Sequence, residues 1–257
     1  MHKLGLKLWS VNTDNYLREA KKLYNRGIYD YIELYIVPNN EDKLSTWKEL
    51  NIPYIIHAPH FLHKMNLSLK EYEENNIKIY REVKLYADIL KAPKIIFHSG
   101  TDGDYKETAR QLKNLNDPRA LIENKPYKLM PAIKGKAYVG TKFEEIEYII
   151  NEVGCGFCFD ICHAICAANS HGLDIYKSLE KWVTLNPNLI HLSDKDISTE
   201  MDFHLNFGNG TIDFGKVLGI LPNNVPITIE TPKKSKKNID DFIEDVNYIR
   251  AIQGGIE

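Results

Sequence analysis

The sequence predicts a single α/β domain over residues 1–257, folded as a (β/α)8 barrel, and three observations carry this prediction. Eight short runs rich in β-branched and aromatic residues recur along the chain. Most of them are continuously apolar, which is typical of strands buried on both faces. Longer amphipathic stretches separate them, each long enough for a right-handed crossover helix, and a strand with its helix averages about 32 residues.

The predicted strands are, in order, residues 4–9, 31–37, 53–58, 94–99, 120–124, 156–161, 189–194 and 227–231. The predicted helices are residues 13–26, 41–50, 68–91, 104–115, 141–152, 173–185, 213–221 and 238–252. The first helix starts at Thr13 and stops before Gly27. The third starts at Ser68, with Glu71 in the capping-box position. A doubly wound open sheet is the rival fold, but the turn after the first strand has no glycine for a phosphate loop.

Composition excludes several classes of protein. Hydrophobic residues make up 43% of the chain and charged residues 26%, which is too apolar for disorder. The net charge of −2 argues against a strongly basic nucleic-acid coat and against a polybasic membrane anchor. We see no membrane-length apolar run and no signal peptide. The four cysteines fall between positions 155 and 166, which suits reduced thiols, so we expect a cytoplasmic protein.

Ionisable residues stand at the ends of six successive predicted strands, and this is the most informative pattern in the chain. In a (β/α)8 barrel these ends meet at one rim, where active sites form. Three further candidates follow the sixth and seventh strands. A single histidine or glutamate at a strand end is more simply a hydrogen-bonded structural group, but six in a row indicate a shared metal site for Zn²⁺, Mn²⁺ or Fe²⁺. The candidate ligands are His57, His98, Glu123, Asp160, His163, His191, Asp202, His204 and Glu230.

Other features leave two interpretations open. His60 and His63 are either solvated or in contact with substrate. Residues 126–140 form the longest irregular stretch, and loops of that length are usually functional. The lysine run at 232–238 is either a solvated loop or a strip that contacts phosphate.

The cysteines are more simply packed than reactive. Cys155 and Cys158 form a C-x₂-C pair, but Cys158 lies in an apolar strand, where a buried thiol is normal. Cys162 and Cys166 have the spacing of two residues packed on one face of a helix.

Seven short motifs follow one another along the chain. They are HAPH (57–60), FHSG (97–100), IEN (122–124), CFDICHAICAA (158–168), IHLSDK (190–195), DFHLNFGNG (202–210) and IETP (229–232). Each is weak alone, but in this order, over residues 53–232, they resemble the endonuclease IV group of the xylose isomerase-like barrels.

The resemblance implies up to three metal ions, zinc first, with manganese or iron possible at some sites. It places the first ion on His57, His98 and Glu123. Glu123 bridges to the second, which Asp160, His191 and Glu230 complete, and the third lies on His163, Asp202 and His204. The implied activity is hydrolysis of the phosphodiester at abasic sites in DNA, for DNA repair, by a metal-bound hydroxide. Glu123 and Glu230 would be catalytic, and His60 and Lys195 would contact substrate.

Some positions depart from that group. The second strand leads into VPNNEDK (37–43), with no arginine or glutamine wedge, and His60 stands where an intercalating tyrosine is usual. The related sugar and sugar-phosphate isomerases and epimerases use one divalent metal, here on Glu123, Asp160, His191 and Glu230. A small sugar substrate is therefore the alternative to abasic DNA. A third alternative is a silent metal-binding assembly partner. Neither a membrane nor a particular protein partner is predicted.

Overall fold

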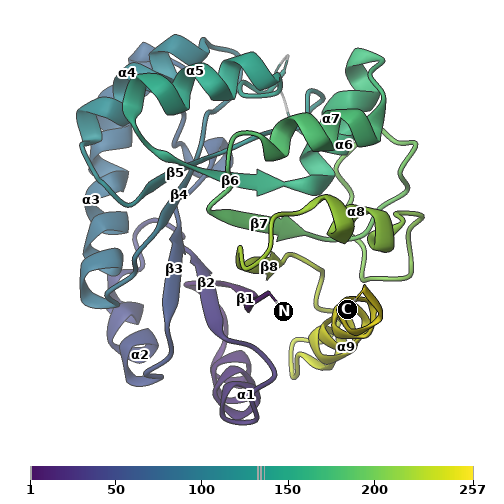
Figure 1. Ribbon diagram of the computed structural model, residues 1–257. Helices are drawn as coiled ribbons and strands as arrows, with labels where there is room; N and C mark the ends of the chain where they lie inside the picture. The colour runs from purple at the N-terminus through teal and green to yellow at the C-terminus, as the bar shows by residue number, and fades with distance from the viewer. Residues whose placement is uncertain (1, 132, 134, 136, 257) are drawn as a thin grey trace.

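Eight parallel strands close a barrel in chain order, and β1 pairs with both β2 and β8 (Figure 1). This computed structural model describes residues 2–131, 133, 135 and 137–256. The strands are β1 (Leu4–Trp9), β2 (Tyr31–Tyr35), β3 (Tyr54–His57), β4 (Ile95–His98), β5 (Ala120–Glu123), β6 (Gly156–Asp160), β7 (Leu189–Leu192) and β8 (Ile227–Ile229). The predicted barrel is confirmed, and all eight strands lie where the sequence predicts them, some ending one or two residues earlier.

Helices surround the barrel and cover the outer faces of the strands (Figure 1). They are α1 (Asp14–Asn25), α2 (Leu44–Glu49), α3 (Glu73–Ile89), α4 (Tyr105–Leu115), α5 (Phe143–Val153), α6 (Ile161–His171), α7 (Ile175–Val183), α8 (Phe214–Ile220) and α9 (Asp240–Ile256). Three short 3-10 helices, η1 (Glu41–Lys43), η2 (Phe61–His63) and η3 (Lys70–Tyr72), lie in the connections.

Two expectations about the helices need correction. The eight helices predicted from the sequence do not include α6, which starts directly after β6, although the spacing of Cys162 and Cys166 indicated helical packing there. The capping box at Ser68 is wrong, because the hydroxyl of Ser68 donates to Asn66 Oδ1 at 2.7 Å and to the Thr101 carbonyl at 3.0 Å instead. The 3-10 turn η3 therefore comes first, and α3 begins only at Glu73.

The inside of the barrel has two layers. The lower layer, which we call the floor, is an apolar cluster of Tyr31, Ile55, Ile96, Leu121, Cys158 and Leu189. Gly5 leaves room for it, since a Cβ there would lie 2.3 Å from the Tyr31 ring. Side chains two residues further along each strand face the same way. They form the upper layer, which we call the polar layer: Lys7, Glu33, His57, His98, Glu123, Asp160, His191 and Glu230.

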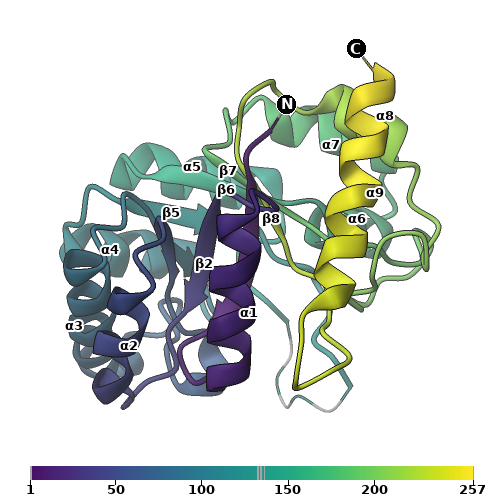
Figure 2. The same cartoon turned by 90° about the horizontal axis from the view of Figure 1, so that it is seen from below.

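The two termini lie at the end of the barrel opposite the connection that contains residues 126–140 (Figure 2). That connection returns to the barrel through a bridge between Tyr138 and Thr101. Ala132, Lys134 and Lys136 of this predicted functional loop lie outside the described residues. Within the part of the chain that is described, no helix combines the length and apolar character needed to cross a membrane.

Candidate metal centre

The barrel brings the nine predicted ligands to one mouth, where they form three overlapping groups. In the first, His57 Nε2 lies 3.2 Å and His98 Nε2 3.0 Å from the same oxygen of Glu123. Glu123 is 1% exposed. The three residues end neighbouring strands β3, β4 and β5, so the parallel register sets their spacing. Their ligand atoms lie within 4.8 Å of one another, close enough to share one ion.

The second group is His163, Asp202 and His204, which also meets the 4.8 Å limit. Asp160, the last residue of β6, caps α6 by accepting a bond from the backbone nitrogen of His163 at 2.8 Å. His163 therefore sits in the first turn of α6. Its Nε2 lies 3.1 Å from Asp202 Oδ2, and His204 Nε2 lies 3.0 Å from the same oxygen.

Asp194 holds the loop that carries Asp202 and His204. Its Oδ2 accepts bonds from the backbone of Gly208 at 2.9 Å and of Gly210 at 2.8 Å. Its backbone pairs with Leu205 in an isolated bridge. A long loop thus becomes a fixed platform for two of the candidate ligands.

The third group surrounds His191, which lies near the carboxyl end of β7. His191 Nδ1 is buried and makes no hydrogen bond. It lies 3.2 Å from Glu230 Oε1, 3.6 Å from Glu123 Oε2 and 3.8 Å from Asp160 Oδ2. A buried nitrogen without a partner costs free energy, so this environment suits a ligand atom.

Backbone carbonyls orient three of the histidine rings. His57 donates from Nδ1 to the Ala58 carbonyl at 2.8 Å, His163 to the Asn124 carbonyl at 3.0 Å, and His204 to the Glu230 carbonyl at 2.6 Å. A carbonyl only accepts, so each Nδ1 carries a proton and each Nε2 points into the cluster. Metal-binding histidines usually show this arrangement, with the far nitrogen bonded to a carbonyl or carboxylate.

The charge balance at the site also favours a cation. Burial disfavours protonation of His163, but Asp160 and Asp202 outweigh it and raise the pKa of His163 to about 10. Burial is likewise outweighed at His204 by Asp202, which raises its pKa to about 10. At His191 burial also disfavours protonation, but the carboxylates Glu230 and Glu33 outweigh it and raise the pKa to about 9. Protons thus fill positions between carboxylates that a divalent ion would fill instead.

The first group is electrostatically different. Burial lowers the pKa of His57, and it lowers the pKa of His98 well below the usual range. Both imidazoles are therefore neutral, which is the form that binds a metal. The chemistry of the donor set and the unbonded His191 nitrogen together fit divalent metal ions, and two of the groups match the sets expected from the sequence.

Three charged residues of the site were not predicted from the sequence. Lys7 forms ion pairs with Glu33 and with Glu230, and Glu33 accepts from His191 Nε2 at 2.9 Å. Lys125 donates to Glu123 Oε1 at 2.9 Å. A lysine or glutamate within a strand buried on both faces is the signal that could have revealed Lys7 and Glu33.

The two predicted substrate contacts have different outcomes. His60 lines the cavity, with its ring stacked 5.7 Å from that of His98. Lys195 does not line it. Lys195 is 0% exposed, and its ammonium donates to the Thr199 carbonyl at 2.7 Å and to Cys166 Sγ at 2.8 Å. In this arrangement Lys195 is held inside the fold and cannot reach a substrate.

The cysteines are free thiols. Cys158 belongs to the floor. Cys162 and Cys166 are both buried in α6, as expected if they pack inside the fold. Burial raises the pKa of Cys155 to about 11 and of Cys166 to about 12, so these thiols are poor nucleophiles.

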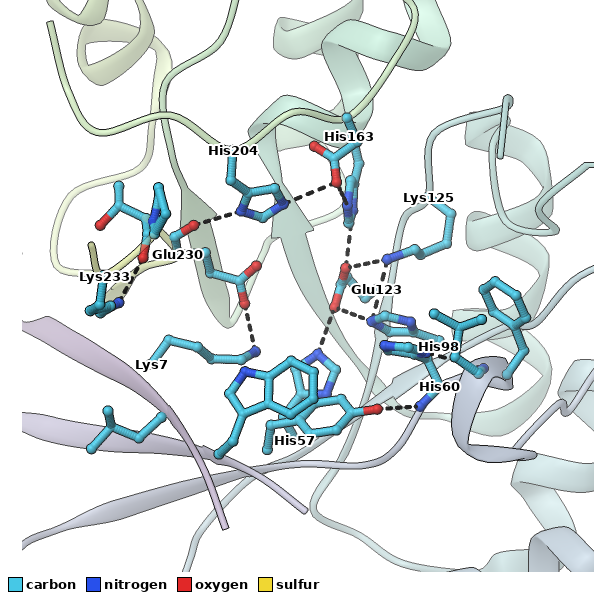
Figure 3. A pocket seen from close by; sticks show the side chains of 18 of the residues that line it. Lys7, His57, His60, His98, Glu123, Lys125, His163, His204, Glu230 and Lys233 are labelled. Atoms are coloured by element: carbon cyan, nitrogen blue, oxygen red, sulfur yellow. Dashed lines mark hydrogen bonds and ion pairs between the residues drawn. The ribbon is translucent and has the colours of Figure 1, made fainter. Parts of the chain in front are cut away.

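A cavity of about 520 Å³ opens above the polar layer, and the charged side chains converge on it (Figure 3). Trp9, Tyr35, Phe61 and Tyr138 give it aromatic walls. Of the lysine run at 232–238, Lys233 lines the cavity, whereas Lys234 is exposed beside Asp241.

The closed (β/α)8 barrel and the histidine–carboxylate cluster at its mouth place this protein among the (β/α)8 barrels whose mouth has residues that could hold metal ions. Residues 27–252 match the model of the xylose isomerase-like TIM barrel family, and the chain belongs to this family.

The resemblance to the endonuclease IV group is also confirmed. A probable endonuclease 4 of Halothermothrix orenii is 25% identical over 223 residues, which cover 79% of each chain. Among solved structures, endonuclease IV from Thermus thermophilus aligns with a TM-score of 0.69 and 19% identity over 98% of this chain and 99% of that one. A D-tagatose 3-epimerase-like protein aligns with a TM-score of 0.74 and 16% identity over 99% of this chain and 98% of that one.

Proposed function

We propose that this protein is a metal-dependent phosphodiester hydrolase that cleaves DNA at abasic sites. The single observation that carries the proposal is the group of His163, Asp202 and His204, assembled beside the group of His57, His98 and Glu123. A one-metal sugar isomerase has no use for these additional ligands. The endonuclease name of the Halothermothrix orenii relative supports the same choice.

The ions would be held by the three ligand sets given above, and Glu123 would belong to both the first set and the second. Zinc is the first choice for a histidine–carboxylate set, and manganese or iron are alternatives. Bound divalent ions would supply Lewis acidity and neutralise charge on the phosphate.

The chain's own residues bind and orient the substrate. Lys7, Lys125 and Lys233 line the cavity and attract a phosphate backbone. Glu230 holds Lys7 in place and Glu123 holds Lys125. In this proposal the two carboxylates also act at the reacting phosphate. The aromatic walls exclude bulk water, which strengthens each electrostatic interaction inside.

A sugar or sugar-phosphate isomerase or epimerase is the second candidate. The surroundings of His191 Nδ1 favour it, because Glu123, Asp160 and Glu230 approach that unbonded nitrogen together. Glu123 and Glu230 would then act as acid and base on a hydroxyketone. The cavity of about 520 Å³ is large enough for such a small substrate.

Metal counting and a nicking assay separate the candidates. Purified protein is loaded with zinc, the bound metal is measured by mass spectrometry, and abasic duplex DNA is tested beside a ketose. The hydrolase predicts nearly three equivalents and DNA nicking, whereas the isomerase predicts one equivalent and ketose turnover. His98→Ala and His204→Ala should each lose about one equivalent and most nicking. His171→Ala, at the end of α6, is the matched control. Intact nicking in both ligand variants would reject the proposal.

A further inference from the structure

Three lysines reach the cavity, and one of them differs from the other two. Lys7 is ion-paired with Glu33 and Glu230, and Lys125 with Glu123. Lys233 has no ion pair with any carboxylate among the described residues, and its ammonium donates only to the Thr231 carbonyl at 2.8 Å.

Burial opposes the charged form of all three lysines, but the carboxylates outweigh it at Lys7 and Lys125 and raise their pKa. At Lys233 burial prevails over the more distant Asp245 and Glu230 and lowers the pKa to about 8. On the order of a tenth of Lys233 is then a neutral amine at neutral pH, whereas the other two stay ammonium ions.

The segment that carries Lys233 is held in place. Tyr16 donates its hydroxyl to the Ser235 carbonyl at 2.6 Å, and Thr231 donates to Asp245 at 2.5 Å. The backbone nitrogen of Lys234 donates to Asp241 at 2.8 Å. Lys233 itself lies over the Phe242 ring at 5.8 Å. Figure 3 shows Lys233 at the cavity wall, on the side of Glu230. The amine is thus presented by a fixed loop rather than by a free surface chain.

We propose that Lys233 is a nucleophilic amine that forms a reversible imine with the open-chain carbonyl of a sugar bound in the cavity. For abasic DNA this inference rests on the proposed function, because the ring-opened deoxyribose carries an aldehyde at C1′. A ketose would offer a ketone in the same way.

Formation of the imine requires neither an oxidant nor a metal. The Lys233 nitrogen attacks the carbonyl carbon, the carbonyl oxygen takes a proton, and the carbinolamine loses water to give a C=N bond. On abasic DNA the imine acidifies the C2′ proton. When a base removes it, the C3′–O bond breaks, and the phosphate leaves with the electron pair. Water then hydrolyses the imine and frees the amine. The resulting strand end carries an unsaturated aldehyde, unlike a product of hydrolysis.

Borohydride trapping tests the proposal. Full-length protein treated with EDTA is mixed with abasic duplex DNA and sodium cyanoborohydride, which reduces an imine to a stable amine. We expect a covalent complex that peptide mapping places on Lys233. Lys233→Arg and Lys233→Ala should lower the yield by about tenfold or more, since neither offers a nucleophilic amine. Lys234→Ala is the matched control and should trap as the wild type does. Circular dichroism verifies that each variant is folded.

A second probe separates this inference from the proposed function. 2-Deoxyribose 5-phosphate carries the same aldehyde without DNA, and its reduced adduct is located by mass spectrometry. An adduct at Lys233 without any DNA hydrolysis would retain the inference and reject the hydrolase. Hydrolysis of abasic DNA with no Lys233 adduct from either probe would retain the hydrolase and reject the inference. Equal labelling of Lys233 and Lys234, or undiminished trapping in Lys233→Arg, would overturn the inference.

Discussion

Glu123 is the residue on which the contacts of the site converge. One carboxylate oxygen faces His57 and His98, and the other accepts from Lys125. Glu123→Gln keeps the shape but removes the charge. We expect kcat on abasic DNA to fall by about a hundredfold or more while KM changes by less than about threefold, because the lost interaction acts on the reacting phosphate rather than on the bound duplex.

Steady-state kinetics on an abasic duplex measure this change. Glu147→Gln, on the exposed face of α5, is the control for loss of one negative charge. An unchanged kcat in Glu123→Gln would contradict the central role of this carboxylate.

At the same scale, the sequence revealed the histidine and carboxylate positions but not all of their neighbours. The ligand types at successive strand ends were readable because parallel strands align their ends. Lys7 and Glu33 escaped notice because a single charge inside a strand resembles a solvent-facing position. Lys195 was expected at the substrate because the resemblance to the endonuclease IV group implied that role. Its direction is set by Cys166 and Thr199, which no spacing rule reveals.

Among the elements, the loop from Asp202 to Gly210 depends most on a single close approach. A Cβ on Gly210 would lie 2.2 Å from Asp194 Oδ1 and 2.3 Å from the Lys195 carbonyl. Gly210→Ala should therefore push the loop away from Asp194 and displace His204. We expect a loss of about 2 kcal/mol in the free energy of unfolding and of about one equivalent of bound metal.

Urea unfolding and metal analysis measure these two effects. Gly219→Ala in α8 is the control, because nothing lies within 4 Å of a Cβ there. If Gly210→Ala retained wild-type stability and metal content, the anchoring by Asp194 would not position the ligands.

The helix α6 has no amphipathic pattern in its sequence. Residues 161–168 are all buried, so no polar face gives the helix a visible period. Its cap is Asp160, which also ends β6, and no connecting residues mark the boundary. The amphipathic helix α1 was predicted within a residue or two, since its buried positions recur on one face.

For the whole molecule, the histidines set how the stability of the metal-free protein depends on pH. In the folded protein the pKa of His57 and of His98 lies below the usual 6.5. Their contribution to folding stability is therefore lost as the pH falls below 6.5. The pKa is raised at His163, His191 and His204, so the contribution of these three to stability is complete below pH 6.5 and is lost as the pH rises toward about 9 or 10. The midpoint of thermal unfolding of EDTA-treated protein should therefore peak near pH 6.5 and fall on both sides.

Metal loading should change that profile. Zinc held only by the folded cluster would add about 2.7 kcal/mol per site at a hundredfold excess over its Kd. Because such binding would displace protons from His163 and His204, the stabilisation by metal should grow as the pH rises from about 6 to 8. Thermal scans with and without zinc at each pH measure the difference. A constant difference across this range would show that no protons are released.

The floor beneath the polar layer determines how substrate and product enter and leave the cavity. The barrel is closed below the polar layer by Tyr31, Ile96, Leu121 and their neighbours, so the described residues leave one entrance. Substrate and product must use this same entrance, and a product that dissociates slowly prevents the next substrate from binding. Turnover at high conversion should accordingly be slowed by its own product in competition with fresh substrate.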